Sequence, residues 1–143
     1  MTELESVIRS MEALGHRVTP SRVAVIAAVL GQTGHFSVDD LGRQARGVGR
    51  ATVFRTVRLL TELDIVCRVL LEDGSLRYRV SRHGHHHHLV CVACGRVQDL
   101  DECAVGDLVR ELAANTEYTI EGHWLEFYGR CAECRSGTLA GVR

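Results

Sequence analysis

Apolar residues recur at helical spacing along the first 30 positions and predict two helices. Gly15 ends the first helix, since glycine readily adopts the left-handed conformation found after a helix C-terminus. Thr19 suits the N-cap of the second helix, and Pro20 suits its first position, where a missing N–H costs nothing. The apolar positions are Leu4, Val7, Ile8, Met11 and Leu14 in the first helix, and Val23, Ile26, Ala27 and Leu30 in the second.

A third and a fourth helix are predicted before residue 64. The segment Ser37–Asp40 resembles a capping box, with Asp40 in place of the usual Glu or Gln, and opens a short helix that runs to Ala45. Gly47 and Gly49 then form a turn. The fourth helix runs from Arg50 to Leu63, and its buried face consists of Val53, Val57 and Leu60.

A β-hairpin follows these helices. Asp73 and Gly74 separate two apolar, β-prone runs, Ile65–Glu72 and Leu76–Val80, and this is a strong hairpin signal. The last three of the four predicted helices have a glycine-containing turn before the final one and are followed by a hairpin. This order is typical of a winged helix-turn-helix. In that arrangement the helix that begins at Arg50 lies in the major groove of DNA. We therefore predict a winged-helix DNA-binding domain over residues 1–81.

The chain changes character after a short hinge predicted at residues 82–84. Two strands, His85–Cys91 and Arg96–Leu100, flank a Cys-x-x-Cys turn, and a last strand, Trp124–Tyr128, precedes a second such turn. A helix lies between them, marked by Val105, Leu108, Val109 and Leu112. The fold class is therefore α+β: an N-terminal winged helix-turn-helix domain, then a small α/β zinc-containing dimerisation domain over residues 85–143.

Composition indicates a soluble globular protein. Hydrophobic residues make up 45% of the chain and charged residues 24%, and no apolar run approaches the roughly 20 residues that span a bilayer. The first 15 residues include acids and no cleavage site for a signal peptide. We therefore expect a cytoplasmic protein with no membrane partner. Its six cysteines then bind metal or take part in redox chemistry and do not form a disulfide scaffold.

The formal net charge of −1 conceals a basic N-terminal part. Residues 1–80 hold 11 Arg against 9 acidic residues, whereas residues 81–143 hold 6 Arg against 9 acidic residues. Five arginines and no acid lie between Leu41 and Leu60. Such a cluster is either a solvated helix face or the contact for an anionic partner. Because Arg50, Arg55 and Arg58 of this cluster fall on the helix predicted to enter the major groove, we favour double-stranded DNA.

Two Cys-x-x-Cys pairs, Cys91/Cys94 and Cys131/Cys134, are separated by 36 residues. Each turn directs two thiolates toward one point, and two such turns supply the four ligands of a closed tetrahedral zinc site. Two independent redox dithiols are the alternative, but these need a helix after a strand in a βαβ unit, and that pattern is absent. We expect structural Zn2+ that holds the fold and performs no catalysis.

Four consecutive histidines, His85 to His88, precede the first cysteine pair. In a strand, alternate side chains face opposite sides, so His86 and His88 point one way while His85 and His87 point the other. One run can therefore supply two metal sites, and imidazole suits zinc, iron, nickel and manganese to varying degrees. A solvated histidine-rich loop is the alternative.

Several of these segments together resemble one family. The run HHHHLVCVACG from His85 resembles the H-H-x-H-L-x-C-x-x-C-G signature of the ferric uptake regulator family. Gly49–Val66 resembles its recognition helix, Arg17–Val25 its second helix, and His123–Cys134 its closing strand with the second cysteine pair. The resemblance implies a metal-dependent repressor that controls metal-ion homeostasis genes and binds palindromic operators as a homodimer.

The resemblance also implies a regulatory metal site with ligands from both domains, namely His35, His86, His88 and Asp99. Cys67 stands where zinc-sensing members have an Asp ligand, and Ser81 where they have a Cys. A thiolate from Cys67 favours zinc, whereas a buried strand cysteine is the alternative. Fe2+ and Zn2+ both fit the regulatory site, Mn2+ and Ni2+ are further candidates, and a peroxide-sensing regulator of the same family is an alternative function.

A second metal site falls, by the same resemblance, on His85, His87 and His123. Its usual fourth ligand, a Glu, falls on Gly106. Either Asp107, Glu102 or Cys103 replaces that ligand, or the site is weak or lost. Of these two roles for Cys103, we expect a plain helix residue and not a ligand.

The recognition helix and its neighbours carry the expected DNA contacts. Arg55 and Thr52 are expected to read base edges, with Phe54 in apolar contact where the family usually has Tyr. The residues expected to bind phosphate are Arg17, Arg22, Arg50 and Arg58.

Two other functional classes compete with this interpretation. A zinc hydrolase or nucleobase deaminase needs an open zinc position with H-E-x-x-H, or H-x-E with P-C-x-x-C, and neither motif occurs, so we expect no enzyme. A zinc-ribbon module that binds a protein partner is the other alternative. A zinc-ribbon module of this kind does not account for the basic winged helix.

Overall fold

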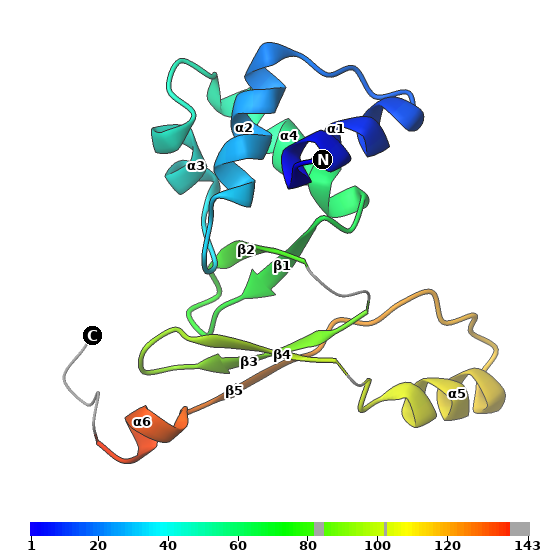
Figure 1. Ribbon diagram of the computed structural model, residues 1–143. Helices are drawn as coiled ribbons and strands as arrows, with labels where there is room; N and C mark the ends of the chain where they lie inside the picture. Colours follow the sequence, from blue (N-terminus) through cyan, green and yellow to red (C-terminus); the bar gives the residue numbers. More distant parts are fainter. Residues whose placement is uncertain (82–84, 102, 138–143) are drawn as a thin grey trace. The chain divides into compact units, whose positions relative to one another are not determined.

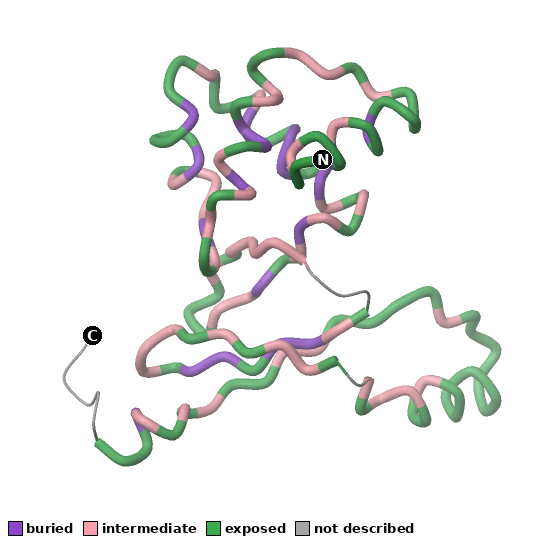
Figure 2. Tube along the Cα trace, in the orientation of Figure 1, coloured by how far each residue is buried: buried purple, intermediate pink, exposed green. Residues whose placement is uncertain are grey.

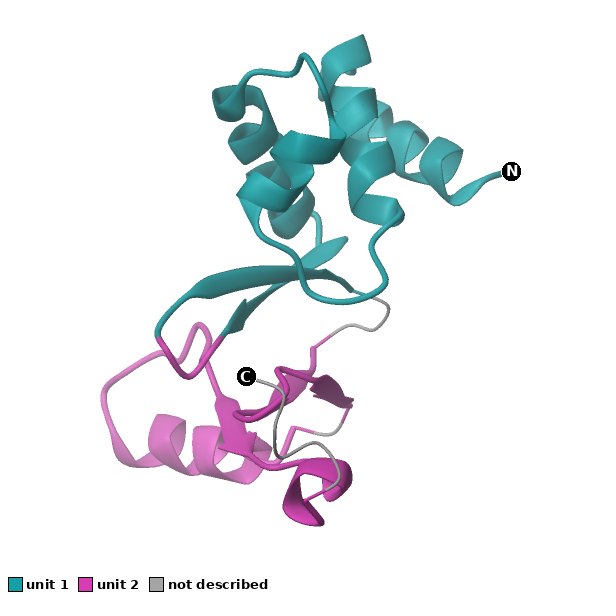
Figure 3. Cartoon of the chain, turned by 90° about the vertical axis from the view of Figure 1, so that its left-hand side faces the viewer, with its two compact units in different colours: residues 1–70, 74–82 teal, residues 71–73, 83–143 magenta. Residues whose placement is uncertain are grey.

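The computed structural model describes residues 1–81, 85–101 and 103–137. The chain forms two compact units, Met1–Leu70 with Gly74–Arg82 and Leu71–Asp73 with His83–Arg143 (Figure 3). The predicted hinge at residues 82–84 lies outside the described residues. None of the described helices is long and apolar enough to cross a membrane.

The first unit consists of four helices and a β-hairpin (Figure 1). The helices are α1 (Glu3–Ala13), α2 (Pro20–Leu30), α3 (Val38–Gln44) and α4 (Arg50–Glu62). The hairpin joins β1 (Val66–Leu70) to antiparallel β2 (Leu76–Val80), and Gly74 in the turn has a φ of 82°. These elements form the winged helix-turn-helix that the sequence predicts, with small shifts at the element ends.

Side-chain caps begin two of these helices as predicted. Thr19 Oγ1 accepts the backbone N–H of Arg22 at 3.2 Å and begins α2. At α3, the backbone N–H of Ser37 donates to Asp40 Oδ2 at 2.8 Å, and the N–H of Asp40 donates to Ser37 Oγ at 3.0 Å. This reciprocal pair is a capping box, and it shows that aspartate can replace the longer Glu at this position.

The core of the first unit is apolar and draws on all four helices and the hairpin (Figure 2). Met11, Leu41 and Val66 are almost completely buried. On α4, the predicted face is confirmed, since Val53 and Leu60 are fully buried.

The buried face of α2 differs from the predicted one. Val25 and Val29 are buried, whereas Ala27 is exposed. Every residue of Val23–Leu30 is apolar, so periodicity alone does not specify which face turns inward. Leu14, predicted on the buried face of the first helix, is 63% exposed because α1 ends one residue before it.

The second unit contains a three-stranded sheet and two helices. The strands are β3 (His87–Cys91), β4 (Val97–Leu100) and β5 (Glu126–Gly129), and the helices are α5 (Gly106–Asn115) and α6 (Ala132–Arg135). The sheet order is β4-β3-β5, with β3 antiparallel to β4 and parallel to β5. The sequence did not predict α6, because four residues are too few to display a helical period.

Candidate metal centres and nucleic-acid interface

The two Cys-x-x-Cys pairs come together at one end of the second unit's sheet. Parallel pairing places Cys91 opposite Gly129, so the turns that follow β3 and β5 leave from the same end. The four Sγ atoms lie within 4.8 Å of one another, and those of Cys94 and Cys131 are 3.8 Å apart. Four thiolates at about 2.3 Å from a tetrahedral zinc ion have sulfur atoms about 3.8 Å apart, so the cluster fits this ion.

The thiols of this cluster need a cation in order to ionise together. Backbone N–H groups of Cys131 and Cys94 lower the pKa of Cys91 to about 6. Burial and the neighbouring thiols raise the pKa of Cys134 to about 12. One thiolate therefore forms readily, whereas burial and the neighbouring thiols oppose deprotonation of Cys134. A divalent ion offsets the negative charge and allows all four thiols to lose their protons.

His86 and His88 form a second group, together with residues of β4 and β5. Their ring centroids are 5.0 Å apart. The Nε2 atom of His88 lies 4.0 Å from Asp99 Oδ1, because these residues are paired across β3 and β4. Its Nδ1 atom lies 2.7 Å from Glu126 Oε1 on β5. Three residues of the predicted regulatory set are thus neighbours, and Glu126, which the sequence analysis did not single out, lies behind them.

The other two candidates for the regulatory set belong to the first unit. His35 precedes Phe36, whose backbone N–H and C=O pair with those of Tyr78 at 2.8 Å, so the loop before α3 is held to β2. Cys67, on β1, donates its thiol to the carbonyl oxygen of Arg79 at 3.5 Å. Both positions are half-buried.

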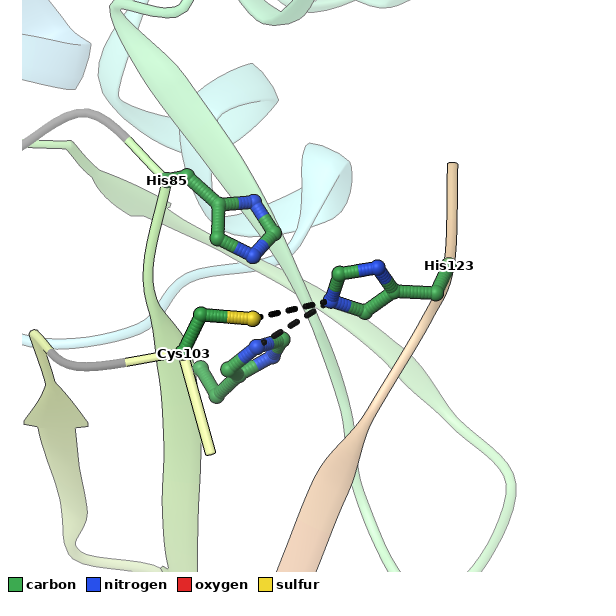
Figure 4. Close-up of side chains that lie close together, drawn as sticks. His85, Cys103 and His123 are labelled. Carbon is green, nitrogen blue, oxygen red and sulfur yellow. Dashed lines mark hydrogen bonds between the residues drawn. The ribbon is translucent and has the colours of Figure 1, made fainter. Parts of the chain in front are cut away.

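A third group of metal-binding side chains consists of His85, His87, His123 and Cys103 (Figure 4). The Nε2 atom of His123 lies 3.2 Å from Nε2 of His87 and 3.7 Å from Sγ of Cys103. His87 is 4% exposed, and burial followed by the charge of His85 lowers its pKa. The neutral imidazole, which is the form that binds metal, is therefore favoured.

Of the candidates for a fourth ligand, Cys103 lies within this group, whereas Asp107 does not. Cys103 precedes α5 instead of lying in a helix, contrary to the expectation of a plain helix residue. Asp107 is 95% exposed and pairs with Arg110, outside the group. Glu102 lies outside the described residues.

The outward face of α4 carries the predicted base-reading residues. Phe54 and Arg55 are exposed, and Thr52 is half-buried. An exposed aromatic ring beside an arginine is unusual for a purely structural helix face and is suited to contact with a nucleic acid.

The four arginines expected to bind phosphate lie around this helix and α2. Arg50 pairs with Asp39, and Arg58 pairs with Glu62 at 3.0 Å, and all four side chains are largely exposed. Arg22 donates to the backbone carbonyl of Arg17 at the start of α2. Two of the four thus have carboxylate partners within the chain.

Residues 13–128 match the ferric uptake regulator family. The chain belongs to this family. The ferric uptake regulation protein of Bacillus subtilis (strain 168) is 31% identical over 139 residues, which cover 92% of this chain and 93% of that protein. The peroxide-responsive repressor PerR of Staphylococcus aureus (strain USA300) is 28% identical over 137 residues, which cover 93% and 92% of the two chains.

Solved structures of ferric uptake regulators share the fold. The Vibrio cholerae ferric uptake regulator is 29% identical, with a TM-score of 0.61 over 86% of this chain and 98% of that chain. A zinc uptake regulator in complex with zinc and DNA is 23% identical, with a TM-score of 0.75 over 96% and 99%. The protein is thus a metal-responsive transcriptional regulator and not an enzyme, as the sequence predicts.

Proposed function

We propose that this regulator is a cytoplasmic repressor that binds palindromic operator DNA as a homodimer when loaded with metal, and so controls metal-ion homeostasis genes. The observation that carries the proposal is the presence of an arginine-bearing helix, α4, in one unit and grouped histidine ligands in the other. The B. subtilis relative, a ferric uptake regulation protein, supports it.

In this proposal α4 enters the major groove. Arg55 and Thr52 read base edges, and Phe54 contacts a thymine methyl group. The carboxylate partners of Arg50 and Arg58 do not prevent phosphate binding, because exposed ion pairs contribute only about 0–1 kcal/mol. Arg17 and Arg22, at the start of α2, add phosphate contacts.

The regulatory ion takes its ligands from both units. The proposed ligands are His86, His88 and Asp99 in the second unit and His35, with Cys67, in the first. Zn2+ is favoured where the Cys67 thiolate is a ligand, and Fe2+ where the set is restricted to His and Asp. Such an ion shifts the chain toward the DNA-binding state because it binds that state more tightly than the other. To change the ratio of DNA-binding to non-binding chains from 1:99 to 99:1, the ion must bind the DNA-binding state about 10⁴-fold more tightly.

Two further metal sites complete the proposal. Structural Zn2+ occupies the four-cysteine cluster, where the sulfur spacing suits it. His85, His87 and His123 hold another ion.

Exposed apolar side chains of the second unit support a homodimer. Helix α5 buries none of its residues within the chain, and Leu108 and Leu112 on it are exposed. Tyr118 and Trp124, between α5 and β5, are also exposed. A monomer rarely exposes so many large apolar groups in one small unit. We therefore expect a second copy of the chain to cover these side chains.

The experiment is operator binding by the full chain at fixed salt, followed by fluorescence anisotropy. The zinc-loaded protein is tested in a mild chelator and with Zn2+, anaerobic Fe2+, Mn2+ or Ni2+. We expect one of these ions to tighten binding by about 10²-fold or more, and the double variant His86→Ala/His88→Ala to lose this response. Equal affinity in chelator and in every metal would overturn the proposal.

Peroxide sensing is a second candidate, supported by the similarity to the PerR repressor. It predicts that peroxide releases operator DNA from the Fe2+-loaded protein but not from the Mn2+-loaded protein, and that a ligand histidine gains one oxygen atom. Mass spectrometry of the treated protein separates this function from metal sensing alone.

A further inference from the structure

Cys103 lies in a cluster that brings three separate segments of the second unit together (Figure 4). His87 is the first residue of β3 and His85 lies two residues before it, while Cys103 comes from the segment before α5 and His123 from the segment before β5. One ligand atom from each of these four residues lies within 4.8 Å of the other three. Side chains so far apart in the sequence share this position only because the fold collects them.

Two of the distances between these ligand atoms match the edges of a metal-ligand tetrahedron. Zn–N bonds of about 2.0–2.1 Å and a Zn–S bond of about 2.3 Å put two nitrogens about 3.3 Å apart and a nitrogen and a sulfur about 3.6 Å apart. The distance from His123 Nε2 to His87 Nε2 is 3.2 Å, and that from His123 Nε2 to Cys103 Sγ is 3.7 Å. The thiol therefore stands at a ligand position.

No carboxylate of the described residues takes that position. Gly106 lines the adjoining cavity of about 470 Å³ and has no side chain to offer. Glu121 also lines the cavity, but it is exposed and is not one of the four clustered ligand residues. Among the described residues, Cys103 is the anionic candidate in this cluster, and it comes from the segment that leads into α5.

We propose that Cys103 is the fourth ligand of a His₃Cys zinc site, an inference that rests on the second metal site proposed above. On binding, the Cys103 thiol releases its proton to solvent, and one thiolate and three neutral imidazoles surround the ion. Thiolate and imidazole favour Zn2+ over Mn2+, which prefers oxygen ligands. The site is therefore selective for zinc, with no open position for a substrate.

Cobalt spectroscopy tests the ligand directly. The background protein carries His86→Ala/His88→Ala and retains zinc in the four-cysteine cluster, so that added Co2+ reports on the proposed site. We expect one Co2+ per chain with a thiolate-to-cobalt charge-transfer band. Adding Cys103→Ser abolishes the band and weakens zinc binding by more than about 100-fold, because losing even a ligand's hydrogen-bond partner costs about 10–100-fold. The matched variant Cys67→Ser is made in the same background, where the regulatory site has already lost His86 and His88. It changes neither the charge-transfer band nor the zinc affinity.

Alkylation of the unaltered full chain provides a second test. Cys103 is half-exposed and reacts with iodoacetamide when the site is empty. Zn2+ slows this reaction roughly tenfold or more, whereas Mn2+ does not, and His123→Ala removes the protection. A cobalt spectrum without the thiolate band, or equal alkylation with and without Zn2+, overturns the proposal and leaves only a thiol–imidazole hydrogen bond. Neither readout uses DNA, so this failure is distinct from failure of the repressor function.

Discussion

The Nδ1 atom of His88 lies 2.7 Å from a carboxylate oxygen of Glu126, and the two side chains are only 4% and 6% exposed. The residues face each other because β3 and β5 pair in parallel with His88 opposite Glu126. The other ring nitrogen, Nε2, lies on the side of Asp99 and is the one that we assign to the proposed regulatory ion. A carboxylate behind a ligand histidine fixes the ring and increases its basicity, so Glu126 is a positioning residue for the proposed regulatory site.

Replacing Glu126 with alanine should weaken the exchangeable metal site by about 10–100-fold, because His88 loses the group that orients it. Glu126→Gln should retain part of the affinity, since the amide oxygen still accepts from Nδ1. Competition titration of the zinc-loaded protein measures both. Zinc in the four-cysteine cluster serves as the internal control and should be unchanged. Wild-type affinity in Glu126→Ala would refute the positioning role.

Replacing Arg55 with alanine should cost about 1–3 kcal/mol of operator binding and relax specificity at one base pair. Arg58→Ala should weaken operator and unrelated DNA alike and reduce the salt slope by about one, as expected for a lost phosphate contact. Arg9→Ala, on the exposed face of α1, is the matched control. Binding curves at several salt concentrations distinguish these outcomes, and equal effects from Arg55 and Arg9 would contradict the assigned interface.

Replacing Asp40 with alanine should destabilise the first unit by about 1 kcal/mol, because the capping box is lost. It also removes the ion pair of 3.3 Å with Arg77, which ties α3 to the wing. Asp39→Ala, in the same helical turn, should cost less, since Asp39 forms an exposed ion pair with Arg50 and does not take part in the capping box. Urea denaturation at neutral pH measures the difference, and equal losses would argue against the cap.

The same carboxylate makes stability depend on pH. The backbone N–H of Ser37 holds the pKa of Asp40 below its ordinary value of 3.8, with further help from Arg43 and Arg77. A group whose pKa is lower in the folded state stabilises the fold above its unfolded pKa and loses this effect as the pH falls through the folded value. The difference in the free energy of unfolding between wild type and Asp40→Ala should therefore decrease below about pH 4.

Removing zinc from the four-cysteine cluster should unfold the second unit, because the ion's binding energy is part of the folding energy. Cys134→Ser should have the same effect, since Cys134 is buried among the other thiols. Thermal denaturation and metal analysis should show loss of zinc together with a lower unfolding temperature. After a mild chelator has removed exchangeable ions, Cys67→Ser should retain both the tightly held zinc and the unfolding temperature. A fully folded, zinc-free Cys134→Ser protein would contradict the structural role.

Short-range patterns in the sequence predicted most of the secondary structure. The caps at Thr19 and Ser37 and the Asp73–Gly74 turn depend on residues within four positions of one another, so local chemistry specifies them. The spacing of the two cysteine pairs likewise indicated one metal cluster, and together these motifs were sufficient to identify the family.

Tertiary structure alone decided which side chains meet. The apolar run Val23–Leu30 of α2 has no unique buried face until α1 and α4 pack against the helix, which is why Ala27 was misplaced. Glu126 is a partner of His88 only through the β3–β5 register, and a shift of one residue would turn it to the other face. Cys103 reaches His123 across 20 positions of chain. Such contacts depend on long-range pairing, which no local period encodes.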